Sequence, residues 1–238
     1  MSCTIVLVHG AFAESASWER VVDPLAANGH RVVAAANPLR SVHGDAAAVS
    51  DLVRTIDGPV VLAVHSYGGA VITNVDADAG EIVGLVYVNA FAPEPGESCS
   101  ALAAMFPGSM LDTQTARPVP CSDGTTDLYI AANSFHEIFC QDLAGPQAAR
   151  MCATQRPVTQ QALSERSGED PLWKHVPSWF LLGEEDRIIP PAVQRYMAER
   201  AQAQRTLAIE GASHAILVSR PDAALHPIRE AAAQRVAA

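Results

Sequence analysis

The chain has 238 residues, 49% of them hydrophobic and 18% charged, a composition that excludes an intrinsically disordered protein. A chain of this length buries roughly 70–75% of the surface of its unfolded form, so its core needs neither disulfides nor a metal. The net charge is −10 and the sequence has no basic run, so nucleic acid is not an expected partner.

Strand and helix patterns alternate over the first third of the chain. Continuous aliphatic and β-branched runs predict buried strands at residues 4–8, 31–36, 60–64 and 82–88. Helical patterns lie between them at residues 18–26, 45–56 and 67–78. Gly29 ends the first of these helices, and Gly58-Pro59 ends the second.

The alternation stops near residue 90 and resumes near residue 178. The segment between is rich in Pro, Gly and Ser, with weak helical patterns at 101–106, 128–139 and 147–154. Two further strands are predicted at 178–182 and 206–209, with a helix after Pro190-Pro191 between them. A last helix is predicted from about Ser219, because Ser219 and Asp222 have capping-box spacing and Pro221 lies in the first turn.

These elements predict an α/β protein with a doubly wound, mostly parallel sheet of six strands. We expect a single domain over residues 1–238, with a core at 1–90 and 177–238 and a mainly helical cap inserted at 91–176. Such an insertion leaves the carboxyl edge of the sheet, where open α/β folds bind ligands.

A candidate nucleophile follows the third predicted strand. The strand at residues 60–64 runs directly into His65-Ser66-Tyr67-Gly68-Gly69, and a helix follows. A serine on such a sharp turn projects its hydroxyl above the sheet edge, as in a nucleophile elbow of the G-x-S-x-G type. Here Val64 replaces the first glycine of that pattern. The alternative interpretation of Ser66 is an ordinary helix N-cap.

A nucleophilic serine needs a base, and the base needs an orienting carboxylate. Gly183-Glu184-Glu185-Asp186 follows the strand at 178–182, and Ser213-His214 follows the last strand. Both segments lie past strand carboxyl ends, at the same edge as Ser66, in the chain order serine, acid, histidine. His214 is the candidate base, with a structural turn histidine as the alternative, and the acid is one of the three carboxylates.

Two backbone N–H groups are candidates for an oxyanion hole. Tyr67 places its N–H at a helix N-terminus, and Ala11 lies in the loop after the first strand. Gly10 permits close approach of that loop, and Phe12 is expected to line the pocket.

The segments VLVHGAF, VHSYGG, GEEDRIIP and GASHAILVSRP together resemble the α/β-hydrolase superfamily. The pattern is similar to small bacterial carboxylesterases of the pyrethroid-hydrolase type and to the plant methylesterase and hydroxynitrile-lyase branch. The resemblance covers residues 3–92 and 177–236 and is weakest in the insertion. It implies Ser66 as nucleophile, Asp186 as acid and His214 as base, with no cofactor and no metal.

The resemblance also separates two branches of the family. Hydroxynitrile lyases typically carry Lys directly after the catalytic histidine and Thr in the loop after the first strand, whereas this chain has Ala215 and Gly10. The resemblance therefore favours hydrolysis of carboxylic esters through an acyl-enzyme. A lactonase, a C–C hydrolase, a hydroxynitrile-lyase-like enzyme with the same triad, and a non-catalytic ligand-binding homologue stay open as alternatives.

The expected substrate is a small or medium-sized, largely apolar ester, because the insertion carries many apolar side chains that could wall a pocket. His136 is a candidate for that pocket, although packing beside Phe135 and Phe139 is the simpler interpretation. His136 and Cys140 share a helix face, but two ligands do not make a zinc site.

Five cysteines without a CxxC pair predict free thiols in a reducing, cytoplasmic compartment. The longest apolar stretch, residues 82–92, is too short to span a membrane, and no basic region of a signal peptide is visible. The expected partner is therefore a small-molecule ester, with a monomer and a homodimer both open.

Overall fold

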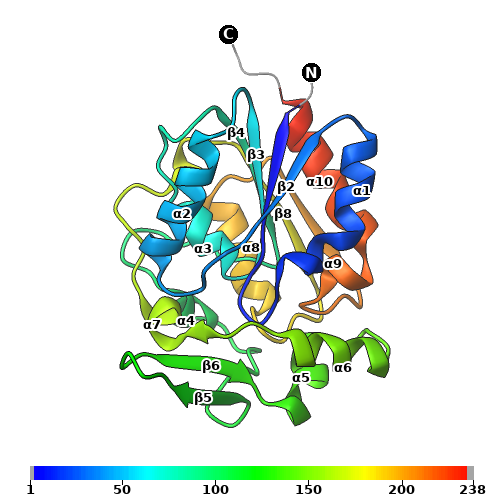
Figure 1. Ribbon diagram of the computed structural model, residues 1–238. Helices are drawn as coiled ribbons and strands as arrows, with labels where there is room; N and C mark the ends of the chain where they lie inside the picture. Colours follow the sequence, from blue (N-terminus) through cyan, green and yellow to red (C-terminus); the bar gives the residue numbers. More distant parts are fainter. Residues whose placement is uncertain (1–2, 235–238) are drawn as a thin grey trace.

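A parallel sheet of six strands forms the centre of the computed structural model, which describes residues 3–234 (Figure 1). Its order is β2-β1-β3-β4-β8-β9, and every neighbouring pair is parallel. The strands are β1 (Thr4–Val8), β2 (Arg31–Ala35), β3 (Val60–His65), β4 (Ile82–Val88), β8 (Ser178–Gly183) and β9 (Arg205–Ile209). The predicted α/β fold and all six predicted strands are confirmed.

Helices cover both faces of this sheet because successive strand residues point to opposite sides (Figure 1). Ile5 and Leu7 of β1 belong to one hydrophobic cluster, whereas Val6 and Val8 belong to the other. The first cluster packs under η1 (Ser15–Trp18), α1 (Glu19–Ala27), α9 (Ile216–Ser219) and α10 (Pro221–Ala233). The second packs under α2 (Val42–Arg54), α3 (Gly68–Thr73) and α8 (Pro191–Arg200).

Two helix predictions differ in detail from the structure. Helix α3 ends at Thr73, before the predicted residue 78, because the chain turns at Asp76 to meet β4. The predicted capping box of Ser219 and Asp222 does not form. Ser219 is the last residue of the separate helix α9, and its hydroxyl is buried without a partner. Pro221 does open α10, as predicted.

Most of the chain between β4 and β8, called the insertion below, lies at the carboxyl ends of the strands, in the lower part of Figure 1, and its last residues run back beside the sheet to the start of β8. Its helices are α4 (Cys99–Ala103), α5 (Ala132–Phe139), α6 (Gly145–Thr154), α7 (Gln160–Ser164) and η2 (Leu172–Lys174). It also contains an antiparallel sheet in the order β5-β6-β7, made of β5 (Ala116–Pro120), β6 (Thr126–Ile130) and β7 (Val158–Thr159).

This small sheet was not predicted, and the helical prediction for residues 128–130 was wrong because they belong to β6. Leu128 pairs with Pro118 on one side and with Val158 on the other. The edge strand contains Pro118 and Pro120, which cannot donate to a ladder, so the local pattern gives no strand signal. Pairing with a residue thirty positions away therefore decides the conformation here.

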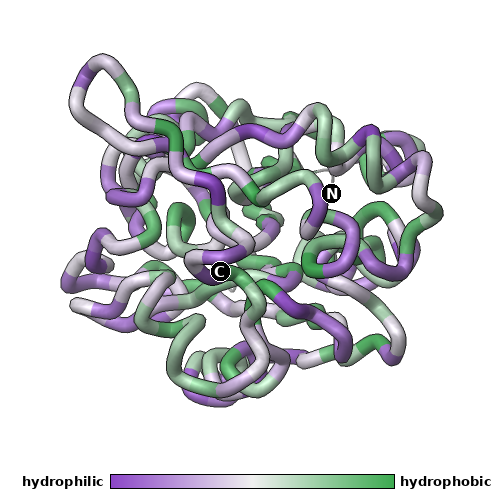
Figure 2. The backbone as a smooth tube through the Cα atoms, turned by 90° about the horizontal axis from the view of Figure 1, so that it is seen from below, coloured by the Kyte–Doolittle hydropathy of each residue, from purple (hydrophilic) through white to green (hydrophobic). Residues whose placement is uncertain are grey.

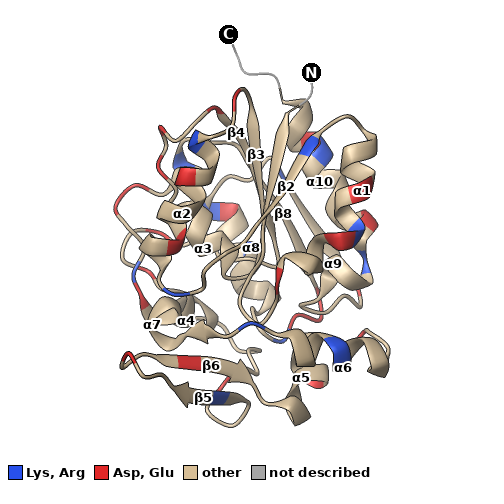
Figure 3. Ribbon diagram, in the orientation of Figure 1, with Lys and Arg blue, Asp and Glu red and all other residues tan. Residues whose placement is uncertain are grey.

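Charged residues are few on the strands of the central sheet and lie mainly on the surrounding helices and loops (Figure 3). Seen from below, from the side of the insertion, hydrophilic and hydrophobic residues are interspersed along the backbone (Figure 2). None of the helices within residues 3–234 is long and apolar enough to cross a membrane.

Candidate active site

Ser66 occupies a tight turn between β3 and α3. Its φ of 57° lies in the left-handed region that residues other than glycine rarely adopt. The Ser66 N–H donates to the carbonyl of Val88 at 3.2 Å, and its carbonyl accepts from Phe91 N at 3.2 Å and from Gly69 N at 3.0 Å. Neighbouring strand ends thus hold the strained backbone, and the hydroxyl lines the cavity described below.

The glycines after Ser66 are required by close packing. A Cβ on Gly69 would lie 2.0 Å from the carbonyl oxygen of Phe91, and one on Gly68 would lie 2.9 Å from that of Val8. The same added Cβ on Gly68 would lie 3.5 Å from Cβ of Val64, an ordinary contact distance. Valine at position 64 therefore fits beneath the turn, and the departure from the glycine pattern does not unwind it.

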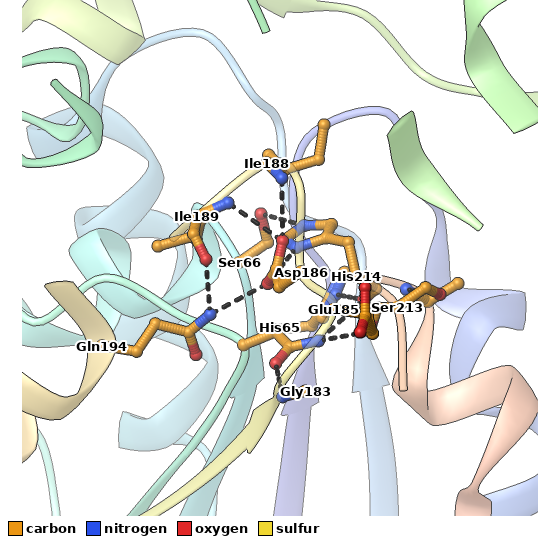
Figure 4. A network of polar contacts seen from close by, with 12 residues as sticks. His65, Ser66, Gly183, Glu185, Asp186, Ile188, Ile189, Gln194, Ser213 and His214 are labelled. Atoms are coloured by element: carbon orange, nitrogen blue, oxygen red, sulfur yellow. Dashed lines mark hydrogen bonds and ion pairs between the residues drawn. The ribbon is translucent and has the colours of Figure 1, made fainter. Parts of the chain in front are cut away.

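The structure brings Ser66, Asp186 and His214 into one hydrogen-bonded chain (Figure 4). His214 Nε2 lies 2.9 Å from Ser66 Oγ, and His214 Nδ1 lies 2.8 Å from Asp186 Oδ2. The side chains of His214 and Asp186 are fully buried. Glu184 and Glu185, the alternative acids, are exposed, and the Glu184 carboxylate pairs with Arg195.

Three further donors surround the Asp186 carboxylate. Oδ1 accepts from the N–H groups of Ile188 at 2.8 Å and Ile189 at 3.0 Å, and Oδ2 accepts from Gln194 Nε2 at 2.9 Å. Gln194 is buried on α8, and no local motif marks it, because its role depends on where that helix packs. Together with His214, these donors fix the position of the carboxylate.

The ring of His214 is packed between a histidine of the core and a phenylalanine of the insertion. The ring centroids of His65 and Phe139 lie 4.6 and 4.9 Å from that of His214. His65 Nε2 donates to the carbonyl oxygen of His214 at 2.9 Å. Burial, and then the nearby His214, hold the pKa of His65 well below its ordinary value, so His65 is neutral at neutral pH.

The loop after β1 lies directly against the serine. A Cβ on Gly10 would lie 2.5 Å from Ser66 Cβ and 3.2 Å from its Oγ. Among the described residues, the N–H groups of Ala11 and Tyr67 donate to no protein acceptor, and both residues line the cavity at Ser66. These two N–H groups are thus available to an oxygen atom of a ligand. Asp45 accepts a hydrogen bond from the Tyr67 hydroxyl at 2.8 Å and holds that side chain in place.

A cavity of about 610 Å³ lies over Ser66, between the core and the insertion. Phe12 lines it, as predicted, and the insertion contributes apolar side chains that include Phe106, Leu111, Leu128 and Leu163. Among residues 3–234, no Lys or Arg contributes to this lining.

Of the described residues in that lining, Asp112 is the only Asp or Glu, and it is exposed. Its carboxylate accepts from the N–H groups of Gln114 at 2.8 Å and Thr115 at 3.0 Å. These two backbone bonds hold the pKa of Asp112 below its ordinary value. The cavity therefore offers a mostly apolar surface with a negative charge at one side.

His136 does not belong to this cavity, and its prediction as a pocket residue was wrong. The buried face of α5 carries Phe135, Ile138 and Phe139, which leaves His136 on the exposed face. Its Nε2 lies 2.9 Å from the carbonyl oxygen of Leu143, outside the cavity.

The cysteines are unpaired, in agreement with the prediction of free thiols. Over residues 3–234, no group of three or more His, Cys, Asp or Glu side chains gathers as a metal site would require.

Comparisons with known proteins extend these observations. Residues 5–226 match the family described as the Alpha/beta hydrolase family. A pyrethroid hydrolase of Sphingobium wenxiniae is 27% identical over 242 residues, which cover 92% of this chain and 83% of that protein.

Two solved structures share the fold. Polyneuridine aldehyde esterase superposes with a TM-score of 0.78 at 19% identity, covering 97% of this chain and 99% of its own. The methylesterase MES16 from Arabidopsis superposes with a TM-score of 0.77 at 15% identity, and the match covers 96% of this chain and 98% of the methylesterase chain.

Proposed function

The chain belongs to the alpha/beta hydrolase family, as its motifs predicted, and from that premise we propose that it hydrolyses carboxylic esters through an acyl-enzyme on Ser66. The observation that carries the proposal is the buried chain of hydrogen bonds from Asp186 through His214 to Ser66, at a cavity beneath the insertion. The names of the relative and of the two structural neighbours, a pyrethroid hydrolase, an esterase and a methylesterase, support an ester as the bond cleaved.

In the proposed reaction, Ser66 Oγ attacks the ester carbonyl while His214 Nε2 accepts the hydroxyl proton. Asp186 keeps the proton of His214 on Nδ1 and stabilises the imidazolium that forms. The N–H groups of Ala11 and Tyr67 donate to the oxyanion of the tetrahedral intermediate. His214 then protonates the leaving alcohol and activates the water that hydrolyses the acyl-enzyme. In that second half the water loses a proton to His214 Nε2 and adds to the acyl carbonyl, and His214 returns the proton to Ser66 Oγ as the acid leaves.

We further propose that the insertion acts as a cap within one domain, with its limits at residues 91–176. Its support is that side chains of the insertion and of the core belong to the same hydrophobic cluster. The turn that carries His214 also contacts the insertion, because the N–H of Ala215, the next residue, donates to the carbonyl of Phe139 at 3.1 Å.

The proposed substrates are uncharged esters with an apolar acyl or alcohol group. A buried charge without a partner costs several kcal/mol, and the described part of the chain offers no Lys or Arg in the cavity lining to an anion. We therefore expect p-nitrophenyl valerate to be hydrolysed with a kcat/KM at least about tenfold above that of the p-nitrophenyl monoester of glutaric acid, since 1.4 kcal/mol already gives tenfold.

The two acyl groups have the same chain length, and only the glutarate ester carries a terminal carboxylate. The ratio of the two kcat/KM values therefore measures the effect of that charge. p-Nitrophenolate release at neutral pH gives both rates after subtraction of the release without enzyme, because the carboxylate of the glutarate ester also displaces p-nitrophenolate from its own ester. A lactone and a cyanohydrin are assayed beside them. If the protein hydrolyses neither ester but turns over the lactone or the cyanohydrin, the ester proposal is wrong and that other reaction replaces it.

A further inference from the structure

We propose that Asn89 is a positioning residue that holds the backbone of His214 in register with the loop of Asp186. This proposal rests on the proposed function for its catalytic meaning. Asn89 follows the last residue of β4 and is fully buried. Strand β4 lies between β3, which leads to Ser66, and β8, which leads to Asp186. The side chain thus starts midway between the segments that carry the nucleophile and the acid.

The amide of Asn89 joins the acid loop to the base turn. Its Nδ2 donates to the carbonyl oxygens of Ser213 at 2.9 Å and His214 at 3.1 Å. Its Oδ1 accepts from the N–H of Gly183 at 2.7 Å. These partners fix the orientation of the amide, because carbonyls need a donor and an N–H needs an acceptor. Gly183, Ser213 and His214 are labelled in Figure 4.

The two segments that Asn89 joins are in direct backbone contact. A Cβ on Gly183 would lie 2.4 Å from the carbonyl oxygen of Ala212, and the Glu185 N–H donates to that oxygen at 3.0 Å. The carbonyl of His214 also accepts from His65 Nε2 at 2.9 Å. The backbone of the base is therefore held by two buried side chains, and of these only Asn89 also bonds to the end of β8.

The backbone of Asn89 is itself constrained. Its φ is 43°, and its N–H donates to the carbonyl of Leu181 at 2.8 Å. Asparagine is one of the few residues other than glycine that adopt this left-handed region readily. Aspartate shares that tolerance, which makes Asn89→Asp a variant that keeps the backbone and the size of the side chain while removing its two N–H donors.

The catalytic consequence follows from the two contacts of the imidazole. His214 reaches Asp186 at 2.8 Å and Ser66 at 2.9 Å only from one position of its backbone. Misplacement of a reacting group by about 1 Å costs about 100-fold in rate. Loss of Asn89 should therefore lower kcat by about 100-fold and leave KM nearly unchanged, because Asn89 does not line the cavity.

The test compares Asn89→Leu and Asn89→Asp with Asn74→Leu. Asn74 also joins two segments through its amide, accepting from Gly168 N at 2.7 Å and donating to Ala70 O at 2.8 Å, but it lies at the end of α3 and contacts no triad residue. Three properties are measured for each folded variant. They are kcat and KM for p-nitrophenyl valerate, the thermal midpoint, and the downfield proton NMR resonance of the His214 Nδ1–H shared with Asp186.

Both Asn89 variants should lose about 100-fold in kcat, with a shifted or broadened imidazole resonance, whereas Asn74→Leu should change only the thermal midpoint. The near-isosteric Asn89→Asp keeps the test informative if Asn89→Leu fails to fold. Wild-type kcat and an unchanged resonance in folded Asn89→Asp would overturn the proposal. If the wild type hydrolyses no ester, the proposed function fails, and the resonance alone still decides whether Asn89 positions His214.

Discussion

Replacing Ser66 by alanine should lower kcat for ester hydrolysis by about 10⁴–10⁶-fold, the range found when triad members are removed from serine hydrolases. The variant loses the hydroxyl to which His214 Nε2 is hydrogen-bonded. It removes one buried oxygen and relaxes no packed apolar contact, so KM and stability should change little. Steady-state kinetics on p-nitrophenyl valerate give kcat and KM, and a thermal melt measures the stability.

Ser50→Ala is the matched control for this prediction. Ser50 is also a buried serine, but its hydroxyl donates to the carbonyl of Ala46 within α2, and the residue does not line the cavity. It should keep wild-type kcat. A Ser66→Ala enzyme with more than about 1% of wild-type kcat would contradict the account, because no other nucleophile within residues 3–234 bonds to His214 Nε2.

The second large effect is expected for Asp186→Asn, which should lower kcat by about 10⁴-fold, as for the equivalent change in the Ser-His-Asp template. Asp186 Oδ1 accepts from two backbone N–H groups, so the asparagine oxygen must take that position. The new NH₂ group then faces His214 Nδ1 and forces the imidazole proton onto Nε2. In that tautomer Nε2 cannot accept the proton of Ser66.

Asp170→Asn provides the matched control, because it changes a second Asp–His pair in the same way. Asp170 contacts His175 Nε2 at 2.5 Å on the exposed surface, away from the cavity. It should leave kcat unchanged. Since Gln194 Nε2 also faces the new NH₂ group, Asp186→Asn should lower the thermal midpoint as well. An Asp186→Asn enzyme within tenfold of wild type would contradict the assignment of the acid.

The core strands and the positions of the proposed nucleophile and base were predictable from the sequence because they depend on local signals, whereas the choice of Asp186 over Glu184 and Glu185 rested on the family resemblance. The short apolar runs of β1, β3 and β4 are typical of strands buried on both faces. Parallel strands then place their carboxyl ends at one edge, which brings Ser66, the 183–186 segment and His214 together without any knowledge of long-range packing.

What the sequence did not reveal depends on contacts between distant segments. Leu128 is a strand residue only because Pro118 and Val158 pair with it. Gln194 and Asn89 support the triad only because α8 and the end of β4 pack beside it. His136 was a candidate for the pocket because it lies in the insertion, but in the structure it lies on the exposed face of α5.

The account is tested most directly by intact-mass spectrometry after treatment of the folded protein with a fluorophosphonate, which reacts with an activated serine. The structure predicts one adduct per chain, located on Ser66 by peptide mapping, and no adduct in Ser66→Ala or His214→Ala. Ser50→Ala should label like the wild type. A folded wild type without an adduct, or an adduct that persists in Ser66→Ala, would contradict the claim that His214 activates Ser66.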